Sequence, residues 1–296
     1  ILRPVEALTQ AARRMGAGDL SQRVEIEATG EVGELAKAFN AMADSLERLE
    51  LLRRMMVTDV AHELRTPLSN VRGYLEAIQD GMVQPTLEVI NSLHEEAMLL
   101  NRLVNDLQEL ALAEAGKLNM EMQPLELHQV VQRASGLAQQ PASQKGIRLR
   151  TQVPAELPLV YADLERLGQI LHNLLDNAIY YTAEGGEILI TAEPEGGFVE
   201  IHVQDTGSGI AAEHLPYIFE RFYRADQSRS RATGGAGLGL AIARQLVEAQ
   251  GGQISACSQV GVGTTISFSL PIAAEDQAAA AKTSNQKQSI KQHSIP

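Results

Sequence analysis

The sequence predicts a multidomain protein in which an all-α region of long helices precedes an α/β sandwich. Hydrophobic residues make up 44% of the 296 residues and aromatic residues only 4%, which is typical of aliphatic helices rather than of an all-β sandwich. Apolar stripes with alternating spacings of three and four come first, and short alternating segments follow from about residue 120. We expect domains at 1–52, 53–117 and 118–273, and a tail at 274–296.

Composition excludes several classes of protein. The net charge of −12, from 25 basic and 37 acidic residues, argues against a nucleic-acid partner. A single cysteine, Cys257, excludes an internal disulfide framework and suits a reducing compartment. The chain has no run of 18 apolar residues, and it begins at Ile1 without Met. We therefore expect a fragment whose only link to a membrane lies upstream of Ile1.

Residues 1–52 contain two helical patterns around a linker. Pro4 stands near the start of the first pattern, where its missing N–H costs little, and "GAGDLSQRVEIEATG" then breaks the periodicity. The second pattern has apolar residues at spacings of 3, 4, 3, 4 and 3, namely Val32, Leu35, Phe39, Met42, Leu46 and Leu49. This spacing indicates a coiled-coil seam, and an ordinary amphipathic helix is the alternative.

Residues 53–117 predict a helical hairpin. One helix continues to about residue 80, "DGMVQPT" (80–86) forms a turn, and a second helix runs from about 87 to 115. The apolar stripe of the second helix again alternates 3 and 4, at Ile90, Leu93, Ala97, Leu100, Val104, Leu107 and Ala111. Such a hairpin has too little core to stand alone, so we expect a homodimeric four-helix bundle.

Residues 118–273 mix strands and helices. "IRLRTQV" (147–153) alternates like a strand, and 164–182 is a helix with one apolar face made of Leu164, Leu167, Leu171, Leu174 and Ala178. "GEILITAEPEGGFVEIHVQDTG" is two strands around a Gly-Gly turn, "AIARQLVEAQGG" is a helix that ends in glycine, and "QISACSQVGVGTTISFSLP" is a second hairpin. Helices on one face of a mixed sheet are expected. The tail has almost no apolar residues and is predicted to be disordered.

His62 lies in "VTDVAHELRTPLSN" (57–70), on the polar face of a predicted helix. A rotation of about 100° per residue places it opposite the apolar stripe, with Thr66 one turn further on. That stripe consists of Val60, Leu64, Leu68 and Val71. Most single histidines are packed in a core or merely solvated, but here the imidazole is predicted to face water.

The neighbours of His62 favour a reactive role. A neutral imidazole is a nucleophile near neutral pH, and Glu63 can accept its ring proton or orient the ring. Pro67 removes a backbone hydrogen bond, so the helix can bend just beyond the histidine. The pattern indicates an acceptor site on a flexible helix, without identifying the group accepted.

Two further stretches predict a nucleotide pocket. Asn173 and Asn177 share one helix face, where amide oxygens can coordinate Mg²⁺ and contact phosphate oxygens; two surface asparagines are the alternative. Asp205 ends a strand ahead of Gly207 and Gly209. Its carboxylate can accept a hydrogen bond from the exocyclic amine of adenine, and the glycines let a base approach the backbone; a simple β-turn is the alternative.

Two glycine-rich stretches complete this pocket. "TGGAGLGLAIARQL" (233–246) opens into a helix, as a phosphate cradle does. A dinucleotide-binding reading fails because polar loop, not a strand, precedes the run, so a mobile lid over a nucleotide fits better. "GVGTT" (261–265) adds glycines and hydroxyls near the phosphate end. Each signal is modest, but their combination in this order is specific.

Taken together, these stretches resemble a sensor histidine kinase of a two-component system. "HELRTPL" looks like the H box, "HNLLDNAIYYT" the N box, "DTGSGI" the G1 box, "IFERFYRAD" the F box, "GGAGLGLAI" the G2 box and "GTT" the G3 element. Residues 1–52 resemble a HAMP signal-relay module, and the resemblance covers about residues 1–272. It implies a dimerisation and histidine-phosphotransfer hairpin before a Bergerat-type ATP-binding domain.

The resemblance also implies an order of events. ATP and Mg²⁺ would bind the C-terminal domain, the γ-phosphoryl group would pass to His62, and an aspartate in a response regulator receiver domain would accept it. Thr66 matches the position linked in the family to phosphatase activity on the regulator. A homodimer is implied, as is the cytoplasmic portion of an inner (plasma) membrane protein.

Residue roles carry over motif by motif. Asn173 would hold Mg²⁺, Asn177 would contact a phosphate, and Asp205 would read adenine. Arg224, which closes "FERFYR", would face the γ-phosphate. The other implied nucleotide-binding residues are Tyr181, Gly207, Gly209, Gly235, Gly237, Leu238, Gly239, Leu240 and Thr264.

One position departs from the family pattern. The N box often has a lysine where this chain has Tyr180, so a phosphate-contacting cation can be missing and ATP binding weakened. Two rival classes stay open: a gyrase- or chaperone-type ATPase, and a non-catalytic relay whose nucleotide domain only changes conformation. The ATPases place a glutamate base where this chain has Asn173, which cannot take a proton from water, and this favours transfer to His62.

Overall fold

The computed structural model describes residues 2–24, 30–114, 117–225 and 237–274. The chain divides into two compact units, residues 1–85 and 86–296. No helix among the described residues combines the length and the apolar character that crossing a membrane requires. The predicted disordered tail, apart from residue 274, lies outside the described residues.

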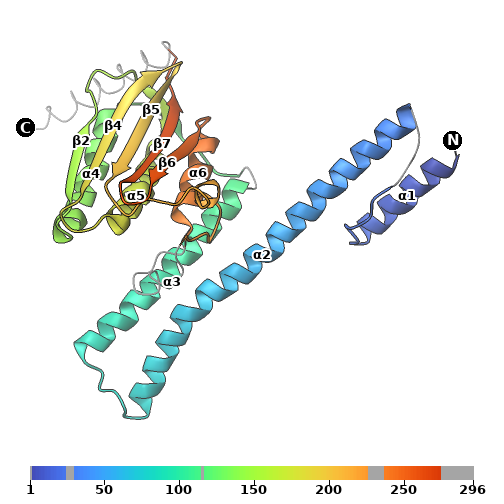
Figure 1. Cartoon of the computed structure of the whole chain (residues 1–296). Helices are drawn as coiled ribbons and strands as arrows, with labels where there is room; N and C mark the ends of the chain where they lie inside the picture. The colour runs from blue at the N-terminus through green and yellow to red at the C-terminus, as the bar shows by residue number, and fades with distance from the viewer. Residues whose placement is uncertain (1, 25–29, 115–116, 226–236, 275–296) are drawn as a thin grey trace, which may run out of the picture. The chain divides into compact units, whose positions relative to one another are not determined.

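The first unit consists of helices α1 (Leu2–Gly16) and α2 (Glu31–Gln79) (Figure 1). A small apolar core joins them, made of Leu8, Ala11, Met15, Val24, Phe39 and Ala43, with Leu20 packed against it. Asn40 of α2 binds both backbone groups of Val24: its Oδ1 accepts from the Val24 N–H at 2.9 Å, and its Nδ2 donates to the Val24 carbonyl at 3.0 Å. This pair of bonds fixes the position of Val24, and so of the connecting segment, along the axis of α2.

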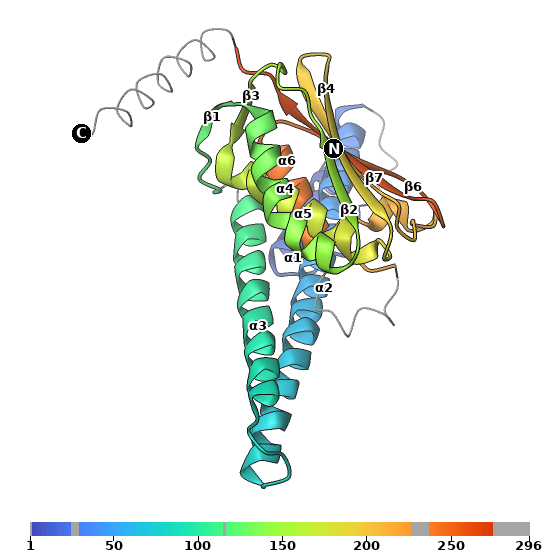
Figure 2. The same cartoon turned by 90° about the vertical axis from the view of Figure 1, so that its left-hand side faces the viewer.

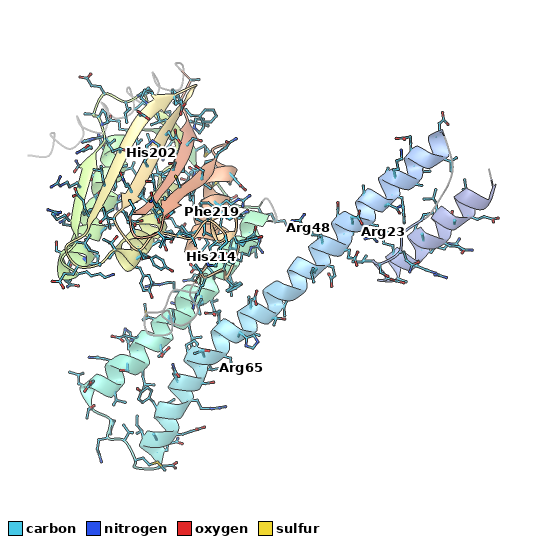
Figure 3. The ribbon with its side chains drawn as sticks, viewed as in Figure 1. Arg23, Arg48, Arg65, His202, His214 and Phe219 are labelled. Carbon is cyan, nitrogen blue, oxygen red and sulfur yellow. The ribbon has the colours of Figure 1, made fainter. Side chains whose placement is uncertain are left out.

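Polar contacts reinforce the same junction. The guanidinium of Arg23 donates to Asp44 at 2.8 Å and to Glu47 at 2.6 Å, and Figure 3 shows Arg23 beside α2. Helix α2 continues without interruption through Pro67, as predicted, and ends before Asp80. The predicted turn of residues 80–86 is confirmed. The predicted bend at Pro67 stays a prediction.

The second unit contains α3 (Leu87–Glu114) and a sandwich whose sheet has the order β2-β4-β5-β7-β6. Its strands are β2 (Arg148–Gln152), β4 (Glu187–Glu195), β5 (Phe198–Asp205), β6 (Ile254–Gln259) and β7 (Gly263–Pro271). β2 runs parallel to β4, and the other pairs are antiparallel. The predicted mixed sheet is confirmed.

Three helices cover one face of this sheet: α4 (Leu127–Gln144), α5 (Leu164–Tyr181) and α6 (Gly239–Ala249). Figure 2 shows them together on one side of the strands. Leu167, Leu171 and Leu174 of α5 are fully buried, as predicted, although Leu164 at the helix start is exposed. Alternate residues of the strands, such as Ile188, Ile190 and Ile201, complete the core.

Two features were not predicted. Helix α4 was missed, and so was a two-stranded antiparallel sheet of β1 (Met122–Leu125) and β3 (Val160–Asp163). The buried residues of α3 also differ from the predicted stripe. Leu103 and Leu110 are buried, whereas Ile90 and Val104 of the stripe are exposed. α3 packs against α6 within the chain, and the exposed part of the stripe remains a prediction for the homodimer.

Candidate functional site

His62 lies on α2 with its side chain exposed, as predicted. Thr66 is also exposed, and its hydroxyl donates to the carbonyl of His62 at 3.5 Å. Glu63 is half-buried. The opposite stripe is only partly covered in a single chain, because Leu68 is 59% exposed. The histidine is therefore accessible, and the helix that carries it presents uncovered apolar surface.

Helix α5 is held at its start by Asp163. Its Oδ1 accepts from the N–H of Glu165 at 2.9 Å and of Arg166 at 3.1 Å, which satisfies two free donors of the first turn. Its Oδ2 accepts from the N–H of Glu121 at 2.7 Å. With its apolar face fixed on the sheet, α5 turns Asn173 and Asn177 away from the leucines.

Asn173 has an unpaired buried amide. Its Nδ2 is inaccessible to water and has no hydrogen-bond partner within the part of the chain that the structure describes. A buried polar group without a partner costs about 1–3 kcal/mol, so the position is unfavourable unless a ligand satisfies it. Rotation about χ2 exchanges the two ends of the amide, so it can donate to a phosphate oxygen or present its carbonyl to a cation.

The start of α6 lies beside this amide. A Cβ built on Gly239, the first residue of α6, would stand 3.7 Å from the side chain of Asn173. Leu238 is the buried N-cap residue, and Leu240 is half-buried in the first turn. A helix N-terminus offers free N–H groups and a positive dipole end to anions. The structure therefore brings the predicted Asn173 and Gly239 together, whereas Gly235 lies outside the described residues.

The segment before α6 is anchored by a backbone bond. The N–H of Phe222 donates to the carbonyl of Gly237 at 3.0 Å, and Phe222 has a positive φ of 57°. A residue other than glycine is strained in this left-handed region of backbone conformation. The surrounding structure must therefore hold Phe222 in it. Arg224 is half-buried two residues later.

Asp205 forms the second part of the site, at the end of β5. Asp205 is buried, with 7% of the residue exposed. Its Oδ1 accepts from the N–H of Gly207 at 2.8 Å and from the N–H of Thr264 at 3.3 Å. Burial raises the pKa of this carboxyl, and the two N–H donors lower it in part. The predicted Asp205, Gly207 and Thr264 thus lie in direct contact.

The turn after Asp205 requires glycine. A Cβ on Gly207 would stand 2.6 Å from the carbonyl oxygen of Tyr181, and Gly209 has a φ of 68° with the backbone of Gln259 directly against it. The N–H of Ser208 donates to the Tyr181 carbonyl at 3.3 Å. This loop therefore rests on the last turn of α5, which joins the Asp205 part of the site to the asparagine part.

Sequence reasoning missed an aromatic group in the F-box-like segment. Nδ1 of His214 and the hydroxyl of Tyr223 lie 2.7 Å apart, and the rings of Tyr217 and Tyr223 lie 5.6 Å apart at 39°. Figure 3 labels His214, which precedes the F-box-like segment, and Phe219 within it. The aromatic residues of "PYIFERFY" were the only available signal, because His214 stands outside that run.

Three segments of the chain match known protein families. Residues 162–274 match the "Histidine kinase-, DNA gyrase B-, and HSP90-like ATPase" family, residues 1–48 match the HAMP domain, and residues 52–116 match the His Kinase A (phospho-acceptor) domain.

Individual proteins are also similar. Signal transduction histidine-protein kinase BaeS of Escherichia coli (strain K12) is 38% identical over 92% of the chain and 58% of its own length. Sensor protein SrrB of Staphylococcus aureus (strain MRSA252) is 38% identical over 75% of the chain and 39% of its own length. The chain therefore spans less than two thirds of either relative.

Among solved structures, Acinetobacter baumannii histidine kinase AdeS has a TM-score of 0.62 at 28% identity, over 72% of this chain and 98% of that one. Histidine kinase ThkA, solved in complex with response regulator protein TrrA, has a TM-score of 0.62 at 26% identity, over 77% of this chain and 64% of that one.

The α/β sandwich and its Asn, Asp and Gly site define an ATP-binding domain shared by kinases and ATPases. The HAMP and phospho-acceptor segments before it narrow this class. The chain belongs to the sensor histidine kinases of two-component systems.

Proposed function

We propose that the chain is an ATP-dependent protein-histidine kinase that phosphorylates His62 and passes the phosphoryl group to an aspartate of a response regulator. One observation carries the proposal. The buried, unpaired amide of Asn173 lies beside the N-terminus of α6, in the same domain as a buried Asp205. An unsatisfied polar group beside a positive helix end fits a phosphate chain with its cation better than it fits a closed core.

The nucleotide would be held at two ends. Asp205 would accept a hydrogen bond from the adenine amine, with Gly207, Gly209, Tyr181 and Thr264 forming the wall around it. Asn177 and the start of α6, with Gly237 and Leu238 just before it and Gly239 and Leu240 in its first turn, would bind the phosphates. Arg224 would face the γ-phosphate, and Gly235 would belong to the lid. Those last two roles rest on the family motif.

The residues present fit a Mg²⁺ ion held jointly with the nucleotide. The described residues contain no cluster of three or more His, Cys, Asp or Glu side chains that could hold a metal. Asn173 would supply one protein ligand, and phosphate oxygens would supply others, as Mg²⁺ commonly requires. When bound, Mg²⁺ neutralises negative charge on the phosphates.

The first step would transfer the γ-phosphoryl group of ATP to His62. A ring nitrogen forms a bond to the γ-phosphorus, while the bond from that phosphorus to the bridging oxygen breaks and ADP leaves. Glu63, next to His62 on α2, would take the ring proton or orient the ring. In the second step the N–P bond breaks as a regulator carboxylate takes the phosphoryl group. Thr66 would serve the later hydrolysis of that acyl phosphate, in which water attacks the phosphorus and the carboxylate and inorganic phosphate are released.

A homodimer would complete the helical part. Leu35, Met42, Leu46 and Leu49 of the predicted seam are all exposed in a single chain. A second copy would bury this stripe, and burying the exposed Leu68, Ile90 and Val104 of the hairpin would give the predicted four-helix bundle. The division at 52, 117 and 273 stays a prediction, as does the placement of the chain as the cytoplasmic portion of an inner-membrane protein. The regulator partner is supported by the ThkA complex.

Labelling with γ-labelled ATP tests the proposal. The expected result is a protein-bound label that is stable to alkali, lost in acid, and absent from His62→Ala. His94→Ala is a matched control, because His94 is also exposed on a helix of the phospho-acceptor segment, and it should label normally. Free phosphate without protein label would favour an ATPase, and no turnover at all would favour a non-catalytic relay.

A further inference from the structure

A lysine from outside the described site holds the last turn of α5. Lys145 follows α4, and its Nζ donates to the carbonyls of Ile179 at 2.7 Å and of Tyr180 at 2.6 Å. The same Nζ stands 5.8 Å from the centre of the Tyr180 ring, within the range of a cation–π contact. Burial lowers the pKa of this ammonium group.

Tyr180 shares one row of α5 with Asn173 and Asn177. Positions 173, 177 and 180 are separated by four and three residues, so they lie in one row along the helix. The rings of Tyr180 and Tyr181 meet edge to face, with centroids 4.7 Å apart. The Tyr181 carbonyl in turn accepts from the N–H of Ser208 in the loop after Asp205. The turn that Lys145 caps is therefore the joint between the two parts of the nucleotide site.

The positive charge of Lys145 favours an anion near the C-terminal end of α5. The last carbonyls of a helix carry partial negative charge, which disfavours an anion placed near them. An ammonium group bonded to two of those carbonyls removes much of this repulsion. The ring beside it carries a hydroxyl that can donate a hydrogen bond, and a cation at the ring draws electron density from the phenol.

We propose that Tyr180 contacts the phosphates of the bound nucleotide through its hydroxyl, and that Lys145 is the positioning residue that fixes this ring and neutralises the end of α5. The inference rests on the proposed nucleotide site. It places the ammonium group of Lys145, just after α4, beside a tyrosine at position 180, where the family often has a lysine. A simple helix cap is the competing explanation for Lys145.

Comparing ligands separates these explanations. Calorimetry on the whole chain should measure dissociation constants for adenosine, ADP and Mg-ATP in the parent protein, Tyr180→Phe, Lys145→Met and Lys145→Arg. Loss of one hydrogen bond to a charged group predicts that Tyr180→Phe weakens Mg-ATP binding by about tenfold and leaves adenosine unchanged. Lys145→Met should show the same selective loss, and Lys145→Arg should recover most of it.

A gain-of-charge variant sharpens the test. Tyr180→Lys should restore Mg-ATP affinity in the Lys145→Met background, because it supplies a cation to the phosphates directly. Tyr74→Phe and Lys117→Met are matched controls on exposed residues outside the site, and neither should change any of the three constants.

Two results would overturn the inference: unchanged Mg-ATP affinity in Tyr180→Phe, or an equal loss of adenosine and Mg-ATP affinity in Lys145→Met. If Lys145→Met does not fold, Tyr180→Phe alone decides, since it leaves both carbonyl bonds in place. Failure of the proposed function looks different, because the parent protein would then bind no Mg-ATP or leave His62 unlabelled.

Discussion

The two parts of the chain differ in how completely they bury their own apolar residues. In the α/β sandwich, α5 and the strands enclose side chains that are fully buried, such as Leu174, Ile188 and Ile201. In the first unit, Phe39 and Ala43 are buried against α1, but Leu46, only three residues further along α2, is 38% exposed. The sandwich is complete as a single chain, whereas the helical part has a seam that only another surface can cover.

This contrast separates two kinds of stability. A complete core responds to mutation in the same way at every protein concentration. A seam covered by a second copy contributes only as far as the copies associate, so its effect depends on concentration. Matched substitutions in the two regions can therefore distinguish them.

The largest effect is expected from Leu174→Ala. Leu174 is fully buried between α5 and the sheet, and removing its side chain leaves a cavity. The free energy of unfolding of the sandwich should fall by about 2–5 kcal/mol. Denaturant unfolding followed at two protein concentrations should give the same loss at both. A loss that changes with concentration would contradict a self-sufficient domain.

Asn40→Ala should have the next largest effect. The substitution removes both bonds to the backbone of Val24 and leaves that N–H and carbonyl without their partner. We expect a loss of about 1–3 kcal/mol in the unfolding of the first unit. Asn40→Asp keeps the acceptor for the Val24 N–H and loses the donor, so it should fall between the two proteins. Thermal unfolding of all three provides the measurement, and equal midpoints would show that the clamp contributes nothing.

Leu46→Ala should be milder and should depend on concentration. Its exposed side chain has little to lose in one chain, but in a dimer it would be buried against the partner copy. The expected cost is about 1–2 kcal/mol per chain, seen in the dimer dissociation constant by analytical ultracentrifugation. Arg48→Ala is a neighbouring control outside the predicted seam and should leave dissociation nearly unchanged. Identical association of the parent and Leu46→Ala would place the dimer contact elsewhere.

The same contrast explains what the sequence could predict. The helix 164–181, its buried leucines and the contacts of Asp205 with Gly207 follow from short local patterns, which packing in one domain then confirms. The structure also confirms the predicted exposure of His62, because a helix face is a local property. Local patterns therefore sufficed for the helix and the turn that carry the candidate site, whereas the roles of its residues rest on the family resemblance.

Elements that depend on distant partners were missed. β1 has only four residues and contains Pro124, so its strand character comes from pairing with β3. α4 includes Gly136 and Pro141, which weaken a helical pattern. Leu103 and Leu110 of α3 are buried but lie outside the predicted stripe, because α3 also packs against α6, a segment far away in sequence. The nearness of Asn173 to Gly239 also joins distant segments, but the motif resemblance had already placed both residues in one pocket.

The smallest predicted effect concerns pH at Asp205. Burial raises the pKa of its carboxyl, so the folded chain favours the protonated form. Its contribution to folding stability is therefore full below the pKa of the unfolded state, and it is lost as the pH rises through the folded pKa. Binding of adenine has the opposite dependence, since the ionised carboxylate is the acceptor for the amine.

Adenosine affinity should consequently weaken on acidification, beginning at a higher pH than an ordinary aspartate would give. Adenosine is the proper ligand for this measurement because it has no phosphates to titrate. Asp205→Asn should bind adenosine more weakly at neutral pH and lose this pH dependence, because its amide does not titrate. Calorimetry between about pH 7 and pH 5 provides the test. An ordinary aspartate stays almost fully ionised over this range. If Asp205→Asn kept the same slope, another group would be titrating, and Asp205 would not be the acceptor that the buried end of β5 indicates.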